Sequence, residues 1–200
     1  MKYPHIYLAS ASPRRHDILN QIGVEHDILR LPPVEGEDEP RLAGESPADY
    51  VVRTARDKAL RGRTLLKTLD PSSFPARPVL GADTTVILGD DILGKPVDSA
   101  DAAKMLRRLA GREHEVRTAV TIATEQDLHT AVSVTTVRFC ELSDNDIADY
   151  CATGEPMGKA GAYGIQGRAG LFVERISGSF TGVMGLPVYE TGQLLRKLLR

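Results

Sequence analysis

The chain has 200 residues, of which 42% are hydrophobic and 26% charged, and its formal net charge is −2. This composition predicts an ordinary globular protein of a single domain, with two lobes at most. The slightly acidic balance argues against a nucleic-acid partner, because nucleic-acid-binding domains usually carry a basic excess. No apolar run approaches the ~18 residues of a membrane span, and the first residues lack the layout of a signal peptide. We therefore expect a cytoplasmic protein with no membrane partner.

The first two elements contain a candidate anion site. Residues 5–9 form an apolar run with the length of a short buried strand. Ser12 and Pro13 then favour a helix start, because serine is a preferred N-cap and proline fits the first helical position. The N-terminus of a helix attracts anions and mildly disfavours cations, yet Arg14 and Arg15 lie in this first turn. The pattern therefore indicates either an anion site or simply two solvated arginines, and local rules do not separate the two.

The next elements lead to a long strand. An acidic loop with three prolines spans residues 31–40, and Ser46 is then expected to cap a helix that runs to about residue 62. A polar connection over residues 71–78 leads to a strand over residues 79–88. A hairpin turn and a short return strand are expected to follow it.

The second half of the chain mixes helices and strands without strict alternation. We expect a helix capped by Ser99, strands over 116–123 and 131–139, a helix from a capping box at 143–146, a glycine-rich loop over 159–167, a strand over 171–176, a glycine-rich loop over 178–185 and a last helix from Pro187. Because this order departs from repeated βαβ units, the fold class predicted is α/β with a mixed sheet.

Asp83 interrupts the apolar strand over residues 79–88. A carboxylate should not be buried without a partner, because its desolvation is costly. We therefore expect Asp83 to face a cleft, where it can bind a metal or act as a base. The alternative is an aspartate exposed to water on an edge strand or a bulge.

Other candidate residues have weaker local support. Glu35 lies in the acidic loop with no spacing that selects it, and Lys58 reads as an ordinary surface lysine. Lys95 lies in a rigid Gly-Lys-Pro turn, and Gln166 lies in a glycine-rich loop where backbone can approach a ligand closely. Neither a Walker A motif nor the dinucleotide-binding fingerprint is present. Together these cations and carboxylates suit a polyphosphate ligand, a divalent ion and an activated water.

The motifs taken together resemble the Maf family. They are Leu-Ala-Ser-Ala-Ser-Pro-Arg-Arg at 8–15, Gly-Ala-Asp-Thr-Thr at 81–85, Gly-Lys-Pro at 94–96, Lys-Ala-Gly-Ala-Tyr-Gly-Ile-Gln-Gly at 159–167 and Gly-Leu-Pro at 185–187. The resemblance implies a nucleoside triphosphate pyrophosphatase with a two-lobed fold similar to inosine triphosphatase and a central cleft. It also implies a divalent cation, Mg²⁺ or Mn²⁺, a homodimer, and a role in removing unwanted nucleotides.

The resemblance also implies roles for single residues. Asp83 matches the proton acceptor that activates the attacking water, and Glu35 matches a metal-binding glutamate, with Asp83 as the second metal ligand. Phosphate contacts are implied for Ser10, Arg15, Lys58 and Lys95.

Substrate choice within the family is associated with three positions, which here are Arg14, Thr84 and Gln166. All three match the branch that acts on dTTP and UTP. The alternatives are a 7-methyl-GTP pyrophosphatase, whose typical residues this chain lacks, and a non-catalytic nucleotide-binding regulator of cell division. Assays with different nucleotides separate the two pyrophosphatases. Metal-dependent turnover separates the dTTP and UTP enzyme from the non-catalytic regulator.

Overall fold

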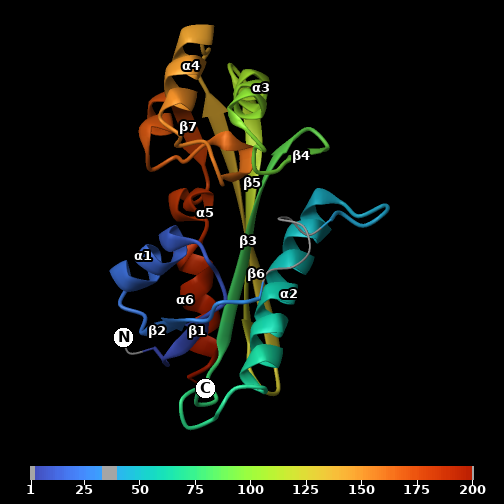
Figure 1. The fold of residues 1–200 in the computed structure, drawn as a ribbon, viewed down its shortest axis with the longest axis vertical. Helices are drawn as coiled ribbons and strands as arrows, with labels where there is room; N and C mark the ends of the chain where they lie inside the picture. The colour runs from blue at the N-terminus through green and yellow to red at the C-terminus, as the bar shows by residue number, and fades with distance from the viewer. Residues whose placement is uncertain (1–2, 33–39, 200) are drawn as a thin grey trace. The chain divides into compact units, whose positions relative to one another are not determined.

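The computed structural model describes residues 3–32 and 40–199, and within them the chain forms a mixed sheet with helices around it (Figure 1). The strands are β1 (Ile6–Leu8), β2 (His26–Ile28), β3 (Val79–Leu88), β4 (Asp91–Leu93), β5 (Glu113–Ala123), β6 (Leu128–Phe139) and β7 (Val173–Ser177). The helices are α1 (Pro13–Gln21), α2 (Pro47–Leu66), α3 (Ser99–Leu109), α4 (Asp144–Ala152), α5 (Phe180–Met184) and α6 (Val188–Lys197), with 3₁₀ turns η1 (Ala160–Ala162) and η2 (Arg168–Phe172).

The described strands form one seven-stranded sheet in the order β2-β1-β3-β5-β6-β7, with β4 paired to β3. Strand β1 runs parallel to both β2 and β3, whereas β4 is antiparallel to β3 and β7 is antiparallel to β6. The α/β class and the mixed sheet predicted from the order of elements are therefore confirmed.

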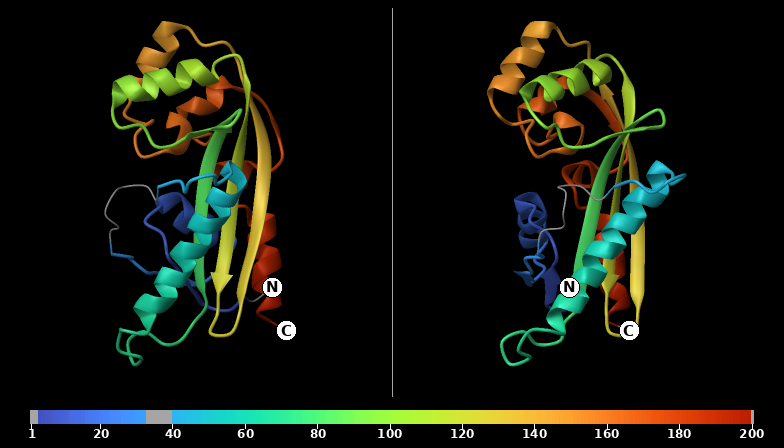
Figure 2. Two further views of the ribbon diagram at one scale, coloured as in Figure 1. Left: turned by 90° about the vertical axis from the view of Figure 1, so that its right-hand side faces the viewer. Right: turned by 45° about the vertical axis from the view of Figure 1, so that its right-hand side comes forward.

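The chain divides into two compact units. Unit 1 contains residues 1–83, 118–132 and 185–200, and unit 2 contains residues 84–117 and 133–184. The long strands β3, β5 and β6, which Figure 2 shows running side by side, each supply residues to both units. The central cleft implied by the family resemblance stays a prediction.

In unit 1, helix α2 packs closely against strand β3. Its start is capped as predicted, because the Ser46 hydroxyl accepts a hydrogen bond from the Asp49 amide at 3.1 Å. A Cβ atom added to Gly81 on β3 would lie 2.5 Å from the amide nitrogen of Ala59 and 2.7 Å from the carbonyl oxygen of Ala55. Only glycine permits this approach, which aligns the middle of α2 with the strand that carries Asp83.

In unit 2, an aromatic cluster fills the core. Phe139 is fully buried, and its ring lies 5.0 Å from His114, 4.9 Å from Tyr163 and 6.1 Å from Phe172. Nε2 of His114 lies 2.8 Å from the Tyr163 hydroxyl, and burial lowers the pKa of His114 to about 4. These contacts attach Tyr163, and with it the glycine-rich segment, to the core of unit 2.

Several sequence predictions need correction. The segment 178–185, expected to be a loop, contains α5, whose start is stabilised by the Ser179 hydroxyl accepting a hydrogen bond from the Gly182 amide at 3.0 Å. Asp98, not Ser99, caps α3, and its carboxylate accepts from the Asp101 amide at 2.7 Å. Strand β2 was not predicted, and α2 continues to Leu66 rather than ending near residue 62.

Candidate functional site

The loop between β1 and α1 places Ser10 and Ser12 at the start of the predicted anion site. Helix α1 begins at Pro13 as predicted, with Ser12 in extended backbone at the N-cap position. The expected side-chain cap is absent, because the Ser12 hydroxyl makes no capping hydrogen bond. The Ser12 amide instead donates to the Ser10 hydroxyl oxygen at 3.2 Å, so the loop is held by its own first serine.

Arg15 is buried and joins this loop to a distant segment of unit 1. Its Nε donates to the carbonyl oxygen of Gly185 at 2.8 Å, and one of its terminal nitrogens donates to the Ser10 hydroxyl oxygen at 3.1 Å. Burial lowers the pKa of Arg15 to about 10, and the negative charge of Asp83 opposes that shift. At neutral pH the guanidinium therefore stays charged in a site from which most water is excluded.

Arg14 differs from Arg15 in its surroundings, since its side chain is only half-buried. Burial lowers its pKa too, and the two guanidinium charges oppose each other, which contributes to the lowered pKa of Arg15. The burial of Arg15 contradicts the interpretation as two solvated arginines. The anion site itself stays a prediction, based on two neighbouring cations at a helix N-terminus.

Asp83 is held by an ion pair with Lys58 of α2. The Asp83 side chain is 16% exposed and that of Lys58 is 28% exposed, so the pair is largely shielded but reachable from solvent. The expectation that this carboxylate is not buried without a partner is confirmed. Close packing at Gly81, two residues before Asp83, brings α2 near enough for the pair to form.

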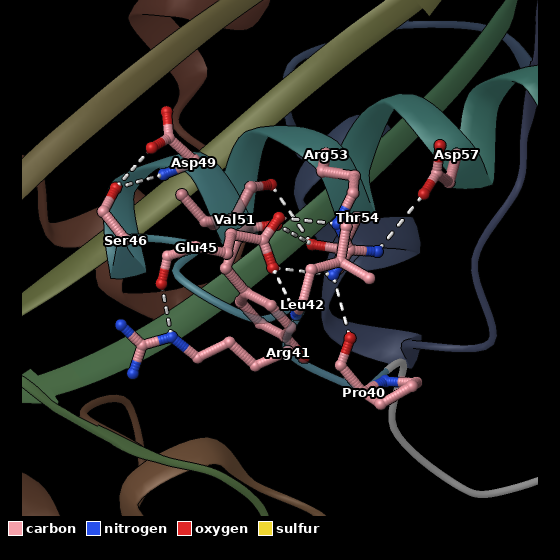
Figure 3. A network of polar contacts seen from close by, with 11 residues as sticks. Pro40, Arg41, Leu42, Glu45, Ser46, Asp49, Val51, Arg53, Thr54 and Asp57 are labelled. Atoms are coloured by element: carbon pink, nitrogen blue, oxygen red, sulfur yellow. Dashed lines mark hydrogen bonds and ion pairs between the residues drawn. The ribbon is translucent and has the colours of Figure 1, made fainter.

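The N-terminal end of α2 is fixed by a network of polar contacts, shown in Figure 3. Arg53 donates from Nε to Oε1 of Glu45 at 2.6 Å, and from a terminal nitrogen to Oε2 of Glu45 and to the carbonyl oxygen of Pro40, each at 3.0 Å. The hydrogen bond from Arg53 holds the pKa of Glu45 below its usual value. The segment before α2 is thereby attached to the helix that presents Lys58.

Unit 2 contains Thr84, Lys95 and Gln166. Thr84 follows Asp83 directly on β3 and is half-buried, whereas Lys95 and Gln166 are exposed. The turn that carries Lys95 is tied to the second glycine-rich segment, because the Gly161 amide donates to the Gly94 carbonyl oxygen at 3.0 Å.

Sequence reasoning missed two residues that hold the turn around Gln166. The Tyr150 hydroxyl donates to Oε1 of Glu155 at 2.9 Å, and the Arg168 amide donates to Oε2 of Glu155 at 3.0 Å. The Gly164 amide in turn donates to the Tyr150 hydroxyl oxygen at 3.3 Å. No local pattern reveals these contacts, because Tyr150 and Glu155 belong to the end of α4 and the turn that follows it.

The predicted site residues thus fall into two groups. Unit 1 brings together Ser10, Arg15, Lys58 and Asp83 with Arg14 beside them, and unit 2 holds Thr84, Lys95 and Gln166. Glu35 lies outside the described residues. Within residues 3–32 and 40–199, no group of three histidine, cysteine, aspartate or glutamate side chains is placed to hold a metal ion.

Fold and site define an α/β protein with a mixed sheet, in which basic side chains and one aspartate gather beside a helix N-terminus. The chain belongs to the Maf family: the family model described as Maf-like protein matches residues 5–198.

Similar proteins cover nearly the whole chain. A protein from Bordetella avium named dTTP/UTP pyrophosphatase is 55% identical over 97% of this chain and 95% of its own length. A protein of the same name from Ralstonia nicotianae is 53% identical over 96% of this chain and 93% of its own. The Ham1 protein of Staphylococcus aureus aligns at a TM-score of 0.41 and 14% identity over 70% of this chain and 73% of that chain. In the part of the chain that the structure describes, no helix is both long and apolar enough to cross a membrane.

Proposed function

We propose that this protein hydrolyses dTTP and UTP to the nucleoside monophosphate and pyrophosphate. The observation that carries the proposal is the arrangement in unit 1, where the ion pair between Asp83 and Lys58 lies within electrostatic range of the buried Arg15. Membership of the Maf family and the relatives named dTTP/UTP pyrophosphatase support the substrate class.

The chemistry follows from the charges of these side chains. Arg15 and the N-terminus of α1 bind the triphosphate, because fixed cations and backbone N–H groups replace the water that phosphate loses. Asp83 accepts a proton from the water that attacks the α-phosphorus. The bond between the α-phosphorus and the oxygen that bridges it to the β-phosphorus then breaks. Lys58 holds the carboxylate of Asp83 in place before the substrate enters. The charge that develops on the departing pyrophosphate is offset by Arg15 and, in this proposal, by Lys95.

A divalent cation, Mg²⁺ or Mn²⁺, is proposed to bind beside Asp83. Mg²⁺ bound with nucleotides usually takes one or two carboxylates, and substrate phosphates and water complete its shell. Asp83 supplies one such carboxylate, and Glu35 is proposed as the second. When bound, the cation would supply electrostatic stabilisation of the phosphate oxygens.

Base selection is proposed to involve Arg14, Thr84 and Gln166. The carboxamide of Gln166 offers one acceptor and two donors, so it can pair with a uracil or thymine edge, which presents both carbonyl oxygens and an N–H group. Its exposed position in a turn of unit 2 is compatible with reaching a ligand.

The direct test incubates the protein with dTTP, UTP and 7-methyl-GTP in the presence of Mg²⁺ or Mn²⁺ and measures pyrophosphate and orthophosphate separately. We expect pyrophosphate release from both pyrimidine nucleotides and little turnover of 7-methyl-GTP. Release of orthophosphate, or no turnover of either pyrimidine, would reject the proposal. Nucleotide binding without turnover at any metal concentration would instead support the regulator of cell division.

Asp83→Asn tests the proposed role of Asp83 as the general base that accepts the proton of the attacking water. Asparagine has nearly the same shape but cannot accept the proton, so we expect kcat to fall by about 10²- to 10⁴-fold with the fold retained. The matched control is Asp90→Asn, which makes the same change at an exposed position in the β3–β4 turn and should keep wild-type kcat. Wild-type activity in Asp83→Asn, with circular dichroism unchanged, would remove Asp83 from its role.

The homodimer implied by the family resemblance is also part of the proposal. Light scattering tests it directly, since a dimer has twice the 21.7 kDa mass of the chain.

A further inference from the structure

The turn that carries Gln166 is held at both of its ends. Within it, the Gly167 amide donates to the Gly164 carbonyl oxygen at 2.9 Å, which closes the turn around Gln166. Ile165, before Gln166, is buried, whereas Gln166 itself is exposed. The direction of the Gln166 side chain therefore depends on how the backbone of this turn is fixed.

Glu155 fixes that backbone through both of its carboxylate oxygens. Oε2 accepts from the Arg168 amide at 3.0 Å, immediately after the turn. Oε1 accepts from the Tyr150 hydroxyl at 2.9 Å, and that hydroxyl accepts from the Gly164 amide at 3.3 Å, where the turn begins. One carboxylate thus bridges the two ends of the turn, directly at Arg168 and through Tyr150 at Gly164.

Gly167 and Lys159 also contact Glu155. A Cβ atom added to Gly167 would lie 2.6 Å from Cδ and 2.7 Å from Oε2 of Glu155, so a side chain at this position would displace the Glu155 carboxylate. The Lys159 ammonium donates to the backbone carbonyl oxygen of Glu155. Burial, followed by the hydrogen bond to Glu155, raises the pKa of Tyr150 well above its usual value, so its hydroxyl keeps its proton to donate.

We infer that Glu155 is a positioning residue for base selection, which acts through the 164–168 turn to aim Gln166 at the nucleobase. The inference rests on the proposed function, because it requires that Gln166 distinguishes one base from another. Glu155 itself touches no substrate in this scheme. Its loss should therefore change which nucleotide is preferred more than it changes how fast phosphate chemistry proceeds.

The experiment measures kcat/KM for UTP and for CTP, whose base edge exchanges the carbonyl acceptor of uracil at position 4 for an amino donor. The proteins are wild type, Glu155→Ala, Gln166→Ala and the double variant, with Asp149→Ala as the control that removes an exposed carboxylate from the same unit. We expect Glu155→Ala and Gln166→Ala each to lower the ratio of UTP to CTP by about tenfold, the effect of one or two lost hydrogen bonds. The double variant should lower the ratio no further, because both changes act on the same contact.

Glu155→Gln keeps the shape of the side chain and one acceptor oxygen, so its ratio should lie between wild type and Glu155→Ala, and it serves if Glu155→Ala does not fold. A merely structural role would lower kcat/KM for UTP and CTP alike and leave the ratio unchanged, which would overturn the inference. So would multiplicative losses in the double variant, or a wild-type enzyme that hydrolyses both nucleotides equally. Absence of any UTP turnover by the wild type would instead defeat the proposed function itself, and the inference with it.

Discussion

Arg15 holds together two segments of unit 1 that lie 170 residues apart in the chain. In Arg15→Lys, a single ammonium replaces the planar guanidinium and cannot reach both Ser10 and Gly185 in the same geometry. We expect KM for dTTP and for UTP to rise by about tenfold, with their ratio unchanged, because the contact proposed for Arg15 is to phosphate. Steady-state kinetics on both substrates measures this, with the exposed Arg30→Lys as the control. A change confined to one nucleotide would assign Arg15 to base selection instead.

His114 makes stability depend on pH. Burial lowers its pKa to about 4 from the usual 6.5, and Nδ1 has no hydrogen-bond partner among the described residues. As pH falls through 6.5, His114 binds a proton in the unfolded chain, whereas in the folded chain it stays neutral until about pH 4. The free energy of unfolding therefore decreases over this window. The full loss is about 3 kcal/mol, of which about 2 kcal/mol falls between pH 7 and pH 5.

Urea denaturation at pH 7 and pH 5 checks this dependence on pH. In His114→Gln the side chain does not titrate but still pairs with the Tyr163 hydroxyl, so the loss of unfolding free energy between the two pH values should shrink by about 2 kcal/mol. An equal loss in both proteins would show that other groups carry the pH dependence.

The candidate site was predictable from sequence only where one residue carries the signal. Asp83 stands out because a carboxylate in an apolar strand needs a partner, and the structure supplies one. That partner, Lys58, lies 25 residues away, and no local rule connects the two. Glu155 escaped prediction for the same reason, since spacing alone does not reveal its hydrogen bonds to the Tyr150 hydroxyl and the Arg168 amide.

At the scale of elements, the contact between α2 and β3 controls the Asp83–Lys58 pair. In Gly81→Ala the added methyl group meets the backbone of Ala55 and Ala59, which cannot rotate away as a side chain would, so α2 must move. We expect a loss of about 3 kcal/mol in unfolding free energy and a lowered kcat, because Lys58 moves with the helix. Thermal denaturation and the pyrophosphate assay measure the two effects.

Gly192→Ala provides the matched control for Gly81→Ala. It adds the same methyl group within helix α6, where the nearest atom, the Tyr3 hydroxyl oxygen, lies 3.6 Å away. Alanine is the better helix former, so this variant should gain up to about 1 kcal/mol. A similar destabilisation in both variants would mean that the effect of Gly81→Ala does not come from the close approach of α2.

The elements that sequence patterns predicted well are those with strong caps or long apolar runs, such as α4 with its complete Ser143 and Asp146 capping box. Strand β2 escaped because its three residues, His26–Ile28, are polar or exposed and gain their structure only by pairing with β1. Helix α5 escaped because Gly182 lowers helix propensity, although Ser179 three residues earlier was a usable capping signal.

At the scale of the molecule, the two units are built from interleaved segments, and β3, β5 and β6 run through both. Unfolding one unit would therefore break the hydrogen bonds between these three strands partway along their length, so we expect the units to unfold together in one transition.

The chain has no tryptophan, so an introduced one reports on its own surroundings. Phe74→Trp places a probe near Tyr7 in unit 1, and Phe172→Trp places one near Tyr150 in unit 2. Urea midpoints from fluorescence, compared with the midpoint from circular dichroism of each variant, should coincide in both proteins. A fluorescence midpoint that departs from the circular dichroism midpoint in either variant would mean that the shared strands do not couple the units.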